Sequence, residues 1–565
     1  MEYKKMYERW LGFDENTRKE LTGLEPSEIQ DRFYKELEFG TGGLRGVIGA
    51  GTNRMNVYTV RKATQGLADY IKRQGIENPS VAIAYDSRRC SQLFAQEAGL
   101  VLCANSIKVY VYKELKPTPM LSYAVRSLGC VAGIVITASH NPKEYNGYKV
   151  YWSDGCQVTE ERADGILQCI LNTDYSNIMT TSLDKAVGDS LYCNVPQCVE
   201  EEYIGRVKEL SINKDALRKA ADSLKIVYTP LNGTGNKPVR SILKELGFKN
   251  VYIVPEQENP DPEFSTLKYP NPEEHDAFTL AIKLAKQENA DIIIGTDPDC
   301  DRIGVVVKNH EGEYRVLTGN QTGSLLTYYM LSQLKQTGTM PQNPMVIKTI
   351  VTTEMARAIC EDFGVELIDV LTGFKYIGEK IQEHIGEKTF LLGYEESYGY
   401  LAGSFVRDKD AVIAAALICE MSAWYKLKGM SLYDALIELY ERYGYYRESL
   451  QSLTMKGIEG SSRIKEIMEE LRENTPESIM GIKVVRVKDY LKSLDRNRVS
   501  GESSQIKLPV SNVIQLILED KSMVTARPSG TEPKIKFYFA AIGKSAEEAD
   551  NKINKLKQAI LDMVK

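Results

Sequence analysis

The chain has 565 residues, of which 43% are hydrophobic and 26% charged, and this composition excludes a disordered, collagen-like or disulfide-stapled small protein. Its net charge of −6 argues against a general nucleic-acid-binding protein, because such proteins usually carry a basic excess. Ten scattered cysteines, without a Cys-x-x-Cys pair, predict free thiols in a reducing compartment. The sequence shows no signal-peptide pattern and no membrane-span window, so we expect a cytoplasmic protein without membrane contact.

Short apolar runs recur in three sets along the chain, and helix-like segments separate the runs. Runs rich in Val, Ile and Leu are typical of strands buried on both faces. Strands that alternate with helices form crossovers, which require parallel pairing. The sequence therefore predicts three β-α-β-α-β sets, with strands at residues 81–85, 108–112 and 131–137, at 225–229, 250–254 and 291–295, and at 345–349, 365–370 and 389–393.

The pattern changes after about residue 445. Residues 512–518, 523–527 and 534–541 look like antiparallel strands with alternating polarity. A terminal helix follows, in which Ser545 and Glu548 fit a capping box. Its expected apolar stripe consists of Ile553, Leu556, Ile560 and Met563.

These patterns predict an α/β fold. It has three similar α/β domains with mixed, largely parallel sheets plus a C-terminal α+β domain, arranged around a central cleft. The expected domains span residues 1–207, 208–321, 322–445 and 446–565.

A polar loop follows the third strand of each α/β set. The three loops read ASHNP, TDPDCDR and YEESYGY. Because chemistry in open α/β sheets gathers beyond the carboxyl ends of the strands, we expect these loops to share one composite cleft.

The segment TASHNPKEYNGYK places Ser139 just past a buried strand. A hydroxyl there can act as a nucleophile once a base activates it, and His140 and Lys149 are the candidates. A lysine base needs a pKa lowered by burial or by nearby cations. We expect Asn146-Gly147 to form a tight turn that returns Lys149 to the loop. The alternative is a structural turn in which Ser139 and Asn141 cap backbone amides.

The segment TDPDCDR carries the strongest metal signal, because Asp297, Asp299 and Asp301 alternate along it. In extended backbone, alternate residues point to one side. Three carboxylates on one side repel unless a cation lies among them, and oxygen ligands favour Mg²⁺ or Ca²⁺. An EF-hand is excluded, because its glycine and glutamate are missing at the required positions. The other alternative is a solvated acidic turn.

Two further loops suit phosphate. GTGGLRG, residues 40–46, combines four glycines with Arg45, which allows close backbone approach and a bidentate contact, although a simple turn would look the same. RPSGTEPK offers a guanidinium, two hydroxyls and turn amides. Its candidate phosphate contacts are Arg527, Ser529, Gly530 and Thr531.

The loop GYEESYGY places Glu395 and Ser397 after a strand. These side chains suit acid/base chemistry or the recognition of sugar hydroxyls, and an exposed acidic turn is the alternative. The run Arg407-Asp408-Lys409 indicates either cationic contacts to a ligand or a solvated charge run.

Together these loops resemble the α-D-phosphohexomutase family, in an ordered match from Gly40 to Lys534. The larger bacterial phosphoglucomutases are similar in length and in GYEESYGY. The resemblance implies four domains around a central cleft. It also implies an isomerase that interconverts α-D-glucose 1-phosphate and glucose 6-phosphate by intramolecular phosphoryl transfer.

The resemblance also assigns roles to matching residues. Ser139 would carry the transferable phosphoryl group, and Mg²⁺ would bind between this phosphoserine and Asp297, Asp299 and Asp301. Arg45, His140 and Lys149 would serve phosphoryl transfer and acid/base steps. The implied substrate-binding residues are Arg302, Thr372, Gly373, Lys375, Glu395, Ser397, Lys409, Arg527, Ser529, Gly530 and Thr531.

The implied partners are small sugar phosphates, with glucose 1,6-bisphosphate as intermediate and activator. No nucleic acid, membrane or obligate protein partner is expected. Phosphomannomutase, phosphopentomutase and sugar-bisphosphate synthase activities remain open on the same scaffold, as does a Mg²⁺-dependent sugar phosphatase. A non-catalytic sugar-phosphate-binding protein is disfavoured, because Ser139, the aspartates and Arg527 are all intact.

Overall fold

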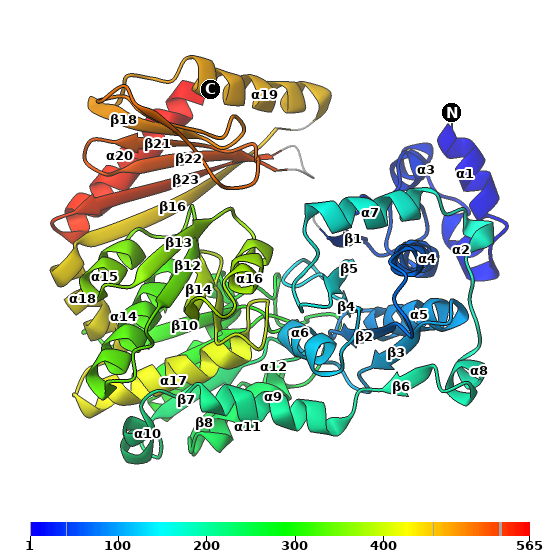
Figure 1. Cartoon of the computed structure of the whole chain (residues 1–565), viewed down its shortest axis with the longest axis horizontal. Helices are drawn as coiled ribbons and strands as arrows, with labels where there is room; N and C mark the ends of the chain where they lie inside the picture. The colour runs from blue at the N-terminus through cyan, green and yellow to red at the C-terminus, as the bar shows by residue number, and fades with distance from the viewer. Residues whose placement is uncertain (1, 41, 456, 530–533, 565) are drawn as a thin grey trace. The chain divides into compact units, whose positions relative to one another are not determined.

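The computed structural model describes residues 2–40, 42–455, 457–529 and 534–564. The chain divides into two compact units (Figure 1). The first comprises Met1–Gly319 and Phe374–Ser431, and the second comprises Asn320–Gly373 and Leu432–Lys565. The bounds of the four expected domains stay a prediction.

The first unit contains a six-stranded sheet in the order β1-β5-β4-β2-β3-β6. Strands β2, β3 and β4 pair in parallel as predicted, whereas β5 and β1 add an antiparallel edge. The central strands β2 and β4 are almost entirely buried and consist mainly of small and apolar residues, and helices α5 and α6 pack against both strands. The strands are β1 (Gly43–Val47), β2 (Ser80–Tyr85), β3 (Lys108–Val111), β4 (Ala132–Ile136), β5 (Tyr145–Trp152) and β6 (Tyr192–Asn194). The helices are α4 (Val57–Arg73), α5 (Ser91–Ala104), α6 (Thr118–Ser127), α7 (Glu160–Leu171), α8 (Leu183–Gly188) and α9 (Gln197–Glu209).

One expected turn is wrong. Asn146 and Gly147 lie inside β5, where they pair with Gly46 and Arg45 of β1. A Cβ at Gly147 would lie 2.5 Å from the Thr137 carbonyl oxygen, so this glycine permits close strand approach instead of a tight turn.

A second sheet of the first unit has the order β11-β10-β9-β7-β8 and repeats this plan. Strands β7, β8 and β9 pair in parallel, and β10 returns antiparallel to β9 after the acidic loop. The elements are β7 (Lys225–Thr229), β8 (Asn250–Ile253), β9 (Ile292–Thr296), β10 (Ile303–Lys308), β11 (Tyr314–Leu317), α10 (Lys214–Ala220), α11 (Asn236–Glu245), α12 (Pro255–Glu258) and α13 (Thr279–Glu288).

The first unit is completed by elements from both ends of its sequence. Helices α1 (Glu2–Trp10), α2 (Glu15–Leu21) and α3 (Pro26–Phe33) enclose an aromatic cluster around the buried Trp10. From the third α/β set come α16 (Phe374–Glu383), α17 (Ala411–Leu427) and the antiparallel pair β14 (Thr389–Glu395) and β15 (Gly399–Ala402).

The second unit contains the parallel pair β12 (Pro344–Thr349) and β13 (Glu366–Val370), with α15 (Met355–Phe363) between them in sequence. Helices α14 (Gly319–Thr337) and α18 (Leu432–Tyr443) belong to the same α/β set. Phe363 ends α15 only partly buried, while Met355 and Ile359 lie in the core.

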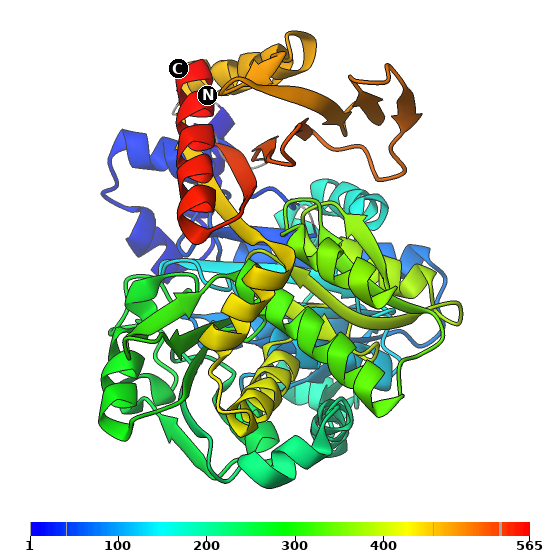
Figure 2. The ribbon, with the colours of Figure 1, turned by 90° about the vertical axis from the view of Figure 1, so that its left-hand side faces the viewer.

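The C-terminal sheet of the second unit has the order β16-β23-β22-β21-β18-β19-β20, and β17 pairs with β18. Helix α20 packs along β16 and β23 (Figures 1 and 2). The elements are β16 (Tyr445–Thr454), α19 (Gly457–Glu473), β17 (Ser478–Ile479), β18 (Ile482–Asp489), β19 (Leu494–Asn497), β20 (Ser503–Gln505), β21 (Ile514–Leu518), β22 (Met523–Pro528), β23 (Lys534–Gly543) and α20 (Ala546–Val564). The predicted α/β class with a C-terminal α+β domain is confirmed, and the sequence patterns missed β16 to β20.

The terminal helix differs slightly from its prediction. The Ser545 hydroxyl accepts the Glu548 amide at 3.2 Å, but the Glu548 carboxylate reaches the amide of Lys544 and not that of Ser545. Met563 is 39% exposed, and Val564 is buried at the end of the stripe instead. Among the described residues, no helix combines the length and apolarity that a bilayer crossing needs.

Candidate active site

Ser139 lies at the carboxyl end of β4, in a backbone conformation with φ of +52°. Its hydroxyl donates to Asp297 Oδ2 at 2.8 Å and lies 3.1 Å from His140 Nδ1. The side chains of Ser139 and Asp297 are 158 positions apart in sequence. The loops after β4 and β9 therefore meet, as the strand-end argument predicted.

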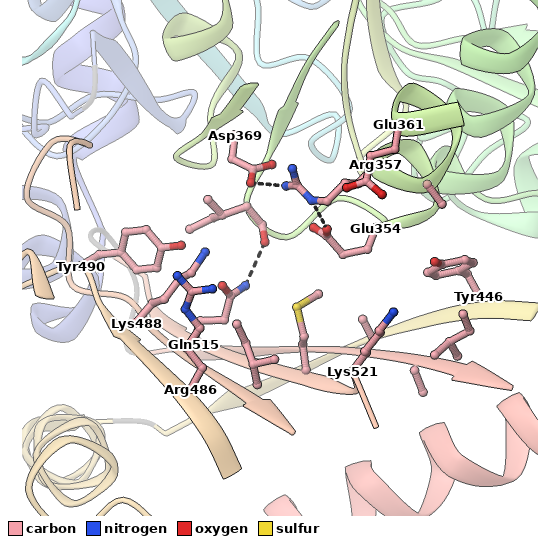
Figure 3. A pocket seen from close by; sticks show the side chains of 17 residues that line it. Glu354, Arg357, Glu361, Asp369, Tyr446, Arg486, Lys488, Tyr490, Gln515 and Lys521 are labelled. Atoms are coloured by element: carbon pink, nitrogen blue, oxygen red, sulfur yellow. Dashed lines mark hydrogen bonds and ion pairs between the residues drawn. The ribbon is translucent and has the colours of Figure 1, made fainter. Parts of the chain in front are cut away.

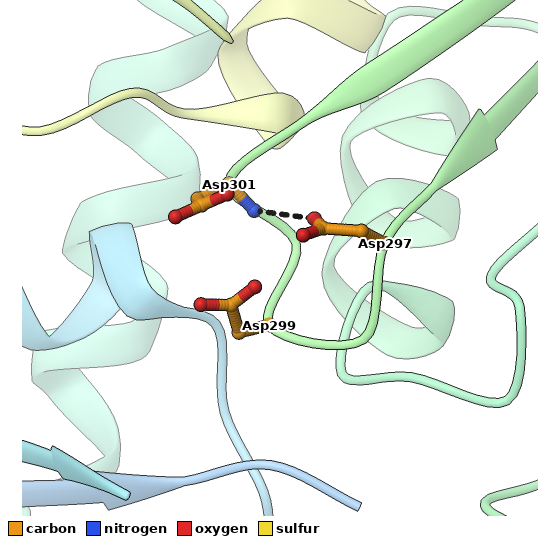
Figure 4. A group of neighbouring side chains, drawn as sticks. All are labelled: Asp297, Asp299 and Asp301. Carbon is orange, nitrogen blue, oxygen red and sulfur yellow. Dashed lines mark hydrogen bonds between the residues drawn. The ribbon is translucent and has the colours of Figure 1, made fainter. Parts of the chain in front are cut away.

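The three aspartates form a compact carboxylate cluster (Figure 4). Asp297, Asp299 and Asp301 are all buried, and one ligand oxygen from each lies within 4.8 Å of the others. The loop is a tight turn between β9 and β10, with φ of +52° at Cys300, and not the extended segment that we expected. Asp297 Oδ1 accepts the amides of Asp301 and Arg302, which closes this turn.

This cluster fits a hard divalent cation. Asp299 Oδ1 and Asp301 Oδ1 are buried oxygens that accept no hydrogen bond from the described part of the chain. Burial, followed by repulsion from Asp299 and Asp301, raises the pKa of Asp297 well above its usual value. Carboxylates in such surroundings are normally paired or bound to metal, and an all-oxygen set suits Mg²⁺ or Ca²⁺. The solvated-turn alternative is contradicted by the burial.

Two lysines neutralise part of the cluster. Lys149 Nζ lies 2.9 Å from Asp299 Oδ2 and 3.4 Å from Asp301 Oδ2, and Lys409 Nζ lies 2.9 Å from the same Asp301 oxygen. Burial lowers the pKa of Lys149, but the two carboxylates outweigh it and the net pKa is raised. A lysine that acts as a general base needs a lowered pKa, so the raised pKa argues against Lys149 in that role.

His140 and Arg45 flank the serine. Burial, followed by the positive charges of Arg302 and Arg45, lowers the pKa of His140 well below its usual value. Arg45 projects from β1, next to β5, and its Nη1 donates to Asn141 Oδ1 at 3.3 Å.

The loop after β14 joins the same site. Arg302 forms a β-bridge with Gly399, and the Ile303 amide donates to the Tyr398 carbonyl. Glu395, at the end of β14, is buried, and burial raises its pKa to about 7 against the opposing charge of Lys409. Ser397 follows in the same partly buried turn, so the exposed-turn alternative is wrong for Glu395.

The run Arg407-Asp408-Lys409 is not a solvated charge run. Asp408 accepts from the Tyr151 hydroxyl and lies 3.3 Å from Lys409, while Arg407 is 1% exposed. Lys375, at the start of α16, pairs with Glu160 at 2.7 Å.

The remaining expected site residues belong to the second unit. Thr372 and Gly373 precede α16, and Gly373 has φ of +127°. Arg527 lies near the end of β22, and the Ser529 amide donates to the Lys534 carbonyl at 2.7 Å. Gly530 and Thr531 lie outside the described residues.

Sequence reasoning missed Thr118 and Glu273. The Thr118 hydroxyl donates to Asp299 Oδ2 at 2.9 Å, and Glu273 pairs with Arg302. Neither residue lies in a recognisable motif. Thr118, for example, is simply the first residue of α6, after Pro117.

A separate cavity of about 550 Å³ lies within the second unit (Figure 3). One wall carries Glu354, Arg357 and Asp369, and the other is the C-terminal sheet with Gln515. Arg357 bridges Glu354 and Asp369, and buried Lys348 pairs with both carboxylates. The two cations Lys348 and Arg357 thus balance the two carboxylates of this wall.

The fold and this centre define an α/β protein with a buried serine beside a cluster of three carboxylates that fits a divalent cation. The chain matches phosphoglucomutase/phosphomannomutase α/β/α domain I over residues 36–177, domain II over 201–312 and domain III over 318–443. It therefore belongs to the phosphoglucomutase/phosphomannomutase family, and the resemblance to the α-D-phosphohexomutases is confirmed.

Curated relatives extend the match over nearly the whole chain. A phosphoglucomutase of Staphylococcus haemolyticus is 39% identical over 538 residues, which cover 95% of this chain and 96% of the relative. A phosphoglucomutase of Staphylococcus aureus is 38% identical, with 93% of each chain covered. The crystal structure of parafusin, a phosphoglucomutase from Paramecium, shares the fold with a TM-score of 0.69 and 17% identity, over 94% of this chain and 96% of that one.

Proposed function

We propose that the chain is a phosphoglucomutase that interconverts α-D-glucose 1-phosphate and glucose 6-phosphate through phosphorylated Ser139. The observation that carries the proposal is the buried Ser139 hydroxyl, 2.8 Å from Asp297 in the carboxylate cluster. The staphylococcal relatives, both named phosphoglucomutase, support glucose as the sugar.

In this proposal the phosphoryl group starts on Ser139 Oγ. A sugar hydroxyl oxygen forms a bond to phosphorus, the bond from phosphorus to Oγ breaks, a base of the site takes the hydroxyl proton, and Ser139 regains a proton. The product is glucose 1,6-bisphosphate, and its other phosphoryl group returns to Ser139 by the reverse steps after the sugar turns over. Alignment and charge neutralisation do most of the work in such transfers.

The chain's own residues divide these tasks. Asp297, Asp299 and Asp301 would hold Mg²⁺, which supplies positive charge for the phosphoryl oxygens when bound. Lys149 and Lys409 keep Asp299 and Asp301 in place by the ion pairs described above. His140, whose lowered pKa favours the neutral imidazole, is the better candidate for accepting a proton. Lys149, whose pKa the carboxylates raise, would act as a proton donor or as a positive charge for phosphoryl transfer, with Arg45 beside the loop.

The other residues would bind the sugar and its second phosphate. Glu395 and Ser397 would accept hydrogen bonds from the 3- and 4-hydroxyls of the sugar. Arg302 would contribute positive charge beside these two residues. Thr372, Gly373 and Lys375 would line the sugar site. The non-transferring phosphate would bind the loop that consists of Arg527, Ser529, Gly530 and Thr531.

A coupled assay tests the proposal. Glucose 1-phosphate, Mg²⁺ and catalytic glucose 1,6-bisphosphate are supplied, and glucose 6-phosphate is detected. We expect turnover that Ser139→Ala abolishes and that Ser127→Ala, at an exposed serine of α6, leaves unchanged. Turnover that survives in Ser139→Ala contradicts a phosphoserine at this position. Release of inorganic phosphate indicates a phosphatase. Activity with mannose 1-phosphate or ribose 1-phosphate, but not with glucose 1-phosphate, contradicts glucose as the sugar.

A further inference from the structure

Arg88 lies behind the serine loop, just past the carboxyl end of β2, and is 3% exposed. Its Nη1 donates to the carbonyl oxygens of Pro142 at 2.8 Å and Tyr145 at 3.2 Å. Its Nη2 donates to the carbonyl oxygens of Ser139 and Asn141. One guanidinium therefore holds four carbonyls of a seven-residue loop, which only the planar multi-donor fork of arginine can do.

Asp86 completes the arrangement. Its carboxylate lies 3.3 Å from Arg88 Nε and accepts the Ser91 and Thr137 hydroxyls, each at 2.7 Å. The Thr137 hydroxyl oxygen in turn accepts the Ser139 amide at 2.8 Å. The two ends of Ser139 are therefore both held, its N–H through Thr137 and its C=O by Arg88.

The conformation of Ser139 explains why such support is needed. A φ of +52° is unfavourable for a residue with a side chain, by about 1–2 kcal/mol. Strained conformations persist where surrounding contacts over-determine them. The same conformation aims Oγ at Asp297, so the support of the backbone sets the direction of the hydroxyl.

The segment between α12 and α13 packs against this support. The Phe264 ring lies 5.2 Å from the Arg88 guanidinium carbon, and Glu263 pairs with neighbouring Arg89. The guanidinium is thus sealed from solvent, and Asp86 compensates its charge. The Arg88 guanidinium donates to backbone carbonyls of the loop, so its action on Ser139 runs through the backbone.

We propose that Arg88, Asp86 and Thr137 are positioning residues that hold Ser139 in its left-handed conformation and thereby align Oγ for phosphoryl transfer. This inference rests on the proposed function for its kinetic consequence. Its structural consequence, a loop ordered by one guanidinium, stands without the activity.

Arg88→Lys is the first test, because an ammonium keeps the charge but cannot reach four carbonyls. Misplacement of a reacting atom by about 1 Å can reduce a rate roughly 100-fold, so we expect kcat to fall by about that factor. The KM for glucose 1-phosphate should stay within about threefold of wild type, because Arg88 contacts no substrate group in the proposal. The matched control is Arg73→Ala, which removes an exposed arginine in the last turn of α4, away from this loop, and should leave both constants unchanged.

The Thr137 pair separates positioning from folding. Thr137→Val preserves shape but loses the hydroxyl that links Asp86 to the Ser139 amide, so kcat should fall about tenfold. Thr137→Ser restores the hydroxyl and should restore kcat. A Thr137→Val enzyme with wild-type kcat, or a Thr137→Ser enzyme as poor as Thr137→Val, would overturn the proposal. This pair decides the matter if Arg88→Lys fails to fold.

Hydrogen exchange supplies a readout that does not depend on activity. In Arg88→Lys we expect amides of residues 138–147 to exchange at least about tenfold faster, while those of β7 to β9 keep wild-type protection. Unchanged exchange in the loop, or a loss that appears only in KM, would refute the positioning role. If wild type itself lacks mutase activity, the proposed function fails, and the exchange experiment still decides whether Arg88 orders the loop.

Discussion

Lys348 on β12 is a fully buried cation that pairs with Glu354 at 2.8 Å and with Asp369 at 3.0 Å. Its ammonium also donates to the carbonyls of Thr349 and Thr352. Arg357 also pairs with both of these carboxylates. The cluster therefore holds two positive and two negative charges.

Lys348→Met leaves two carboxylates facing one arginine. Removal of one partner from a buried ion pair costs about 3–5 kcal/mol, and we expect about 3 kcal/mol because Arg357 remains. At 1.36 kcal/mol per decade, this equals a rise of roughly 160-fold in the equilibrium constant for opening of β12. Native-state hydrogen exchange of the β12 amides measures this opening directly.

The double variant Lys348→Met with Glu354→Gln tests whether charge is the cause. It leaves Arg357 opposite Asp369 and restores the balance of charge. Most of the lost protection against hydrogen exchange should therefore return, although a second charged group has been removed. The penalty of the single variant should also shrink at acid pH. Lys348 holds the pKa of Glu354 down against burial, so its loss lets Glu354 take up a proton more readily, and that protonation removes the excess negative charge. A double variant no better than the single would show that packing, and not charge balance, explains the loss.

Three further outcomes are expected. Burial raises the pKa of Asp410 to about 7, so its contribution to stability declines as pH rises from about 4 to 7, and Asp410→Asn should raise the melting temperature more at pH 8 than at pH 5. Gly43→Ala should unfold the β1 edge, because the added Cβ would lie 2.2 Å from the Tyr148 carbonyl oxygen. Gly205→Ala in α9 places its Cβ in open space and should raise the free energy of unfolding by up to about 1 kcal/mol. Thermal unfolding compares the two variants. Asp299→Asn should weaken Mg²⁺ binding at least about tenfold in calorimetry, and unchanged affinity would place the metal elsewhere.

The repeating strands were predictable because their signal is local. Continuous apolar runs mark strands covered on both faces, and all nine predicted strands are present within a residue or two. The strands β16, β18 and β19 were missed because their side chains are largely polar or half-exposed. Asn146-Gly147 was misread because the same dipeptide serves a turn and a close strand approach.

The site was predictable only as a list of loops. The motifs placed serine, carboxylates and lysine at strand ends, and the parallel topology implied that these ends meet. Nothing local indicated that Thr118 would contact Asp299, or that carboxylates would raise the pKa of Lys149. Both effects depend on contacts between segments that lie about 150 to 180 positions apart in the chain.

The sequence by itself determined the fold class, the family and the candidate loops of the site, since each depends on periodicity or on a contiguous motif. Tertiary structure alone decided the direction of the Ser139 hydroxyl, the burial of Asp408 and the contacts of Arg88 with the loop carbonyls. The physical reason is that side-chain direction, charge balance and burial are properties of packed neighbours, and packing joins residues that no local pattern connects.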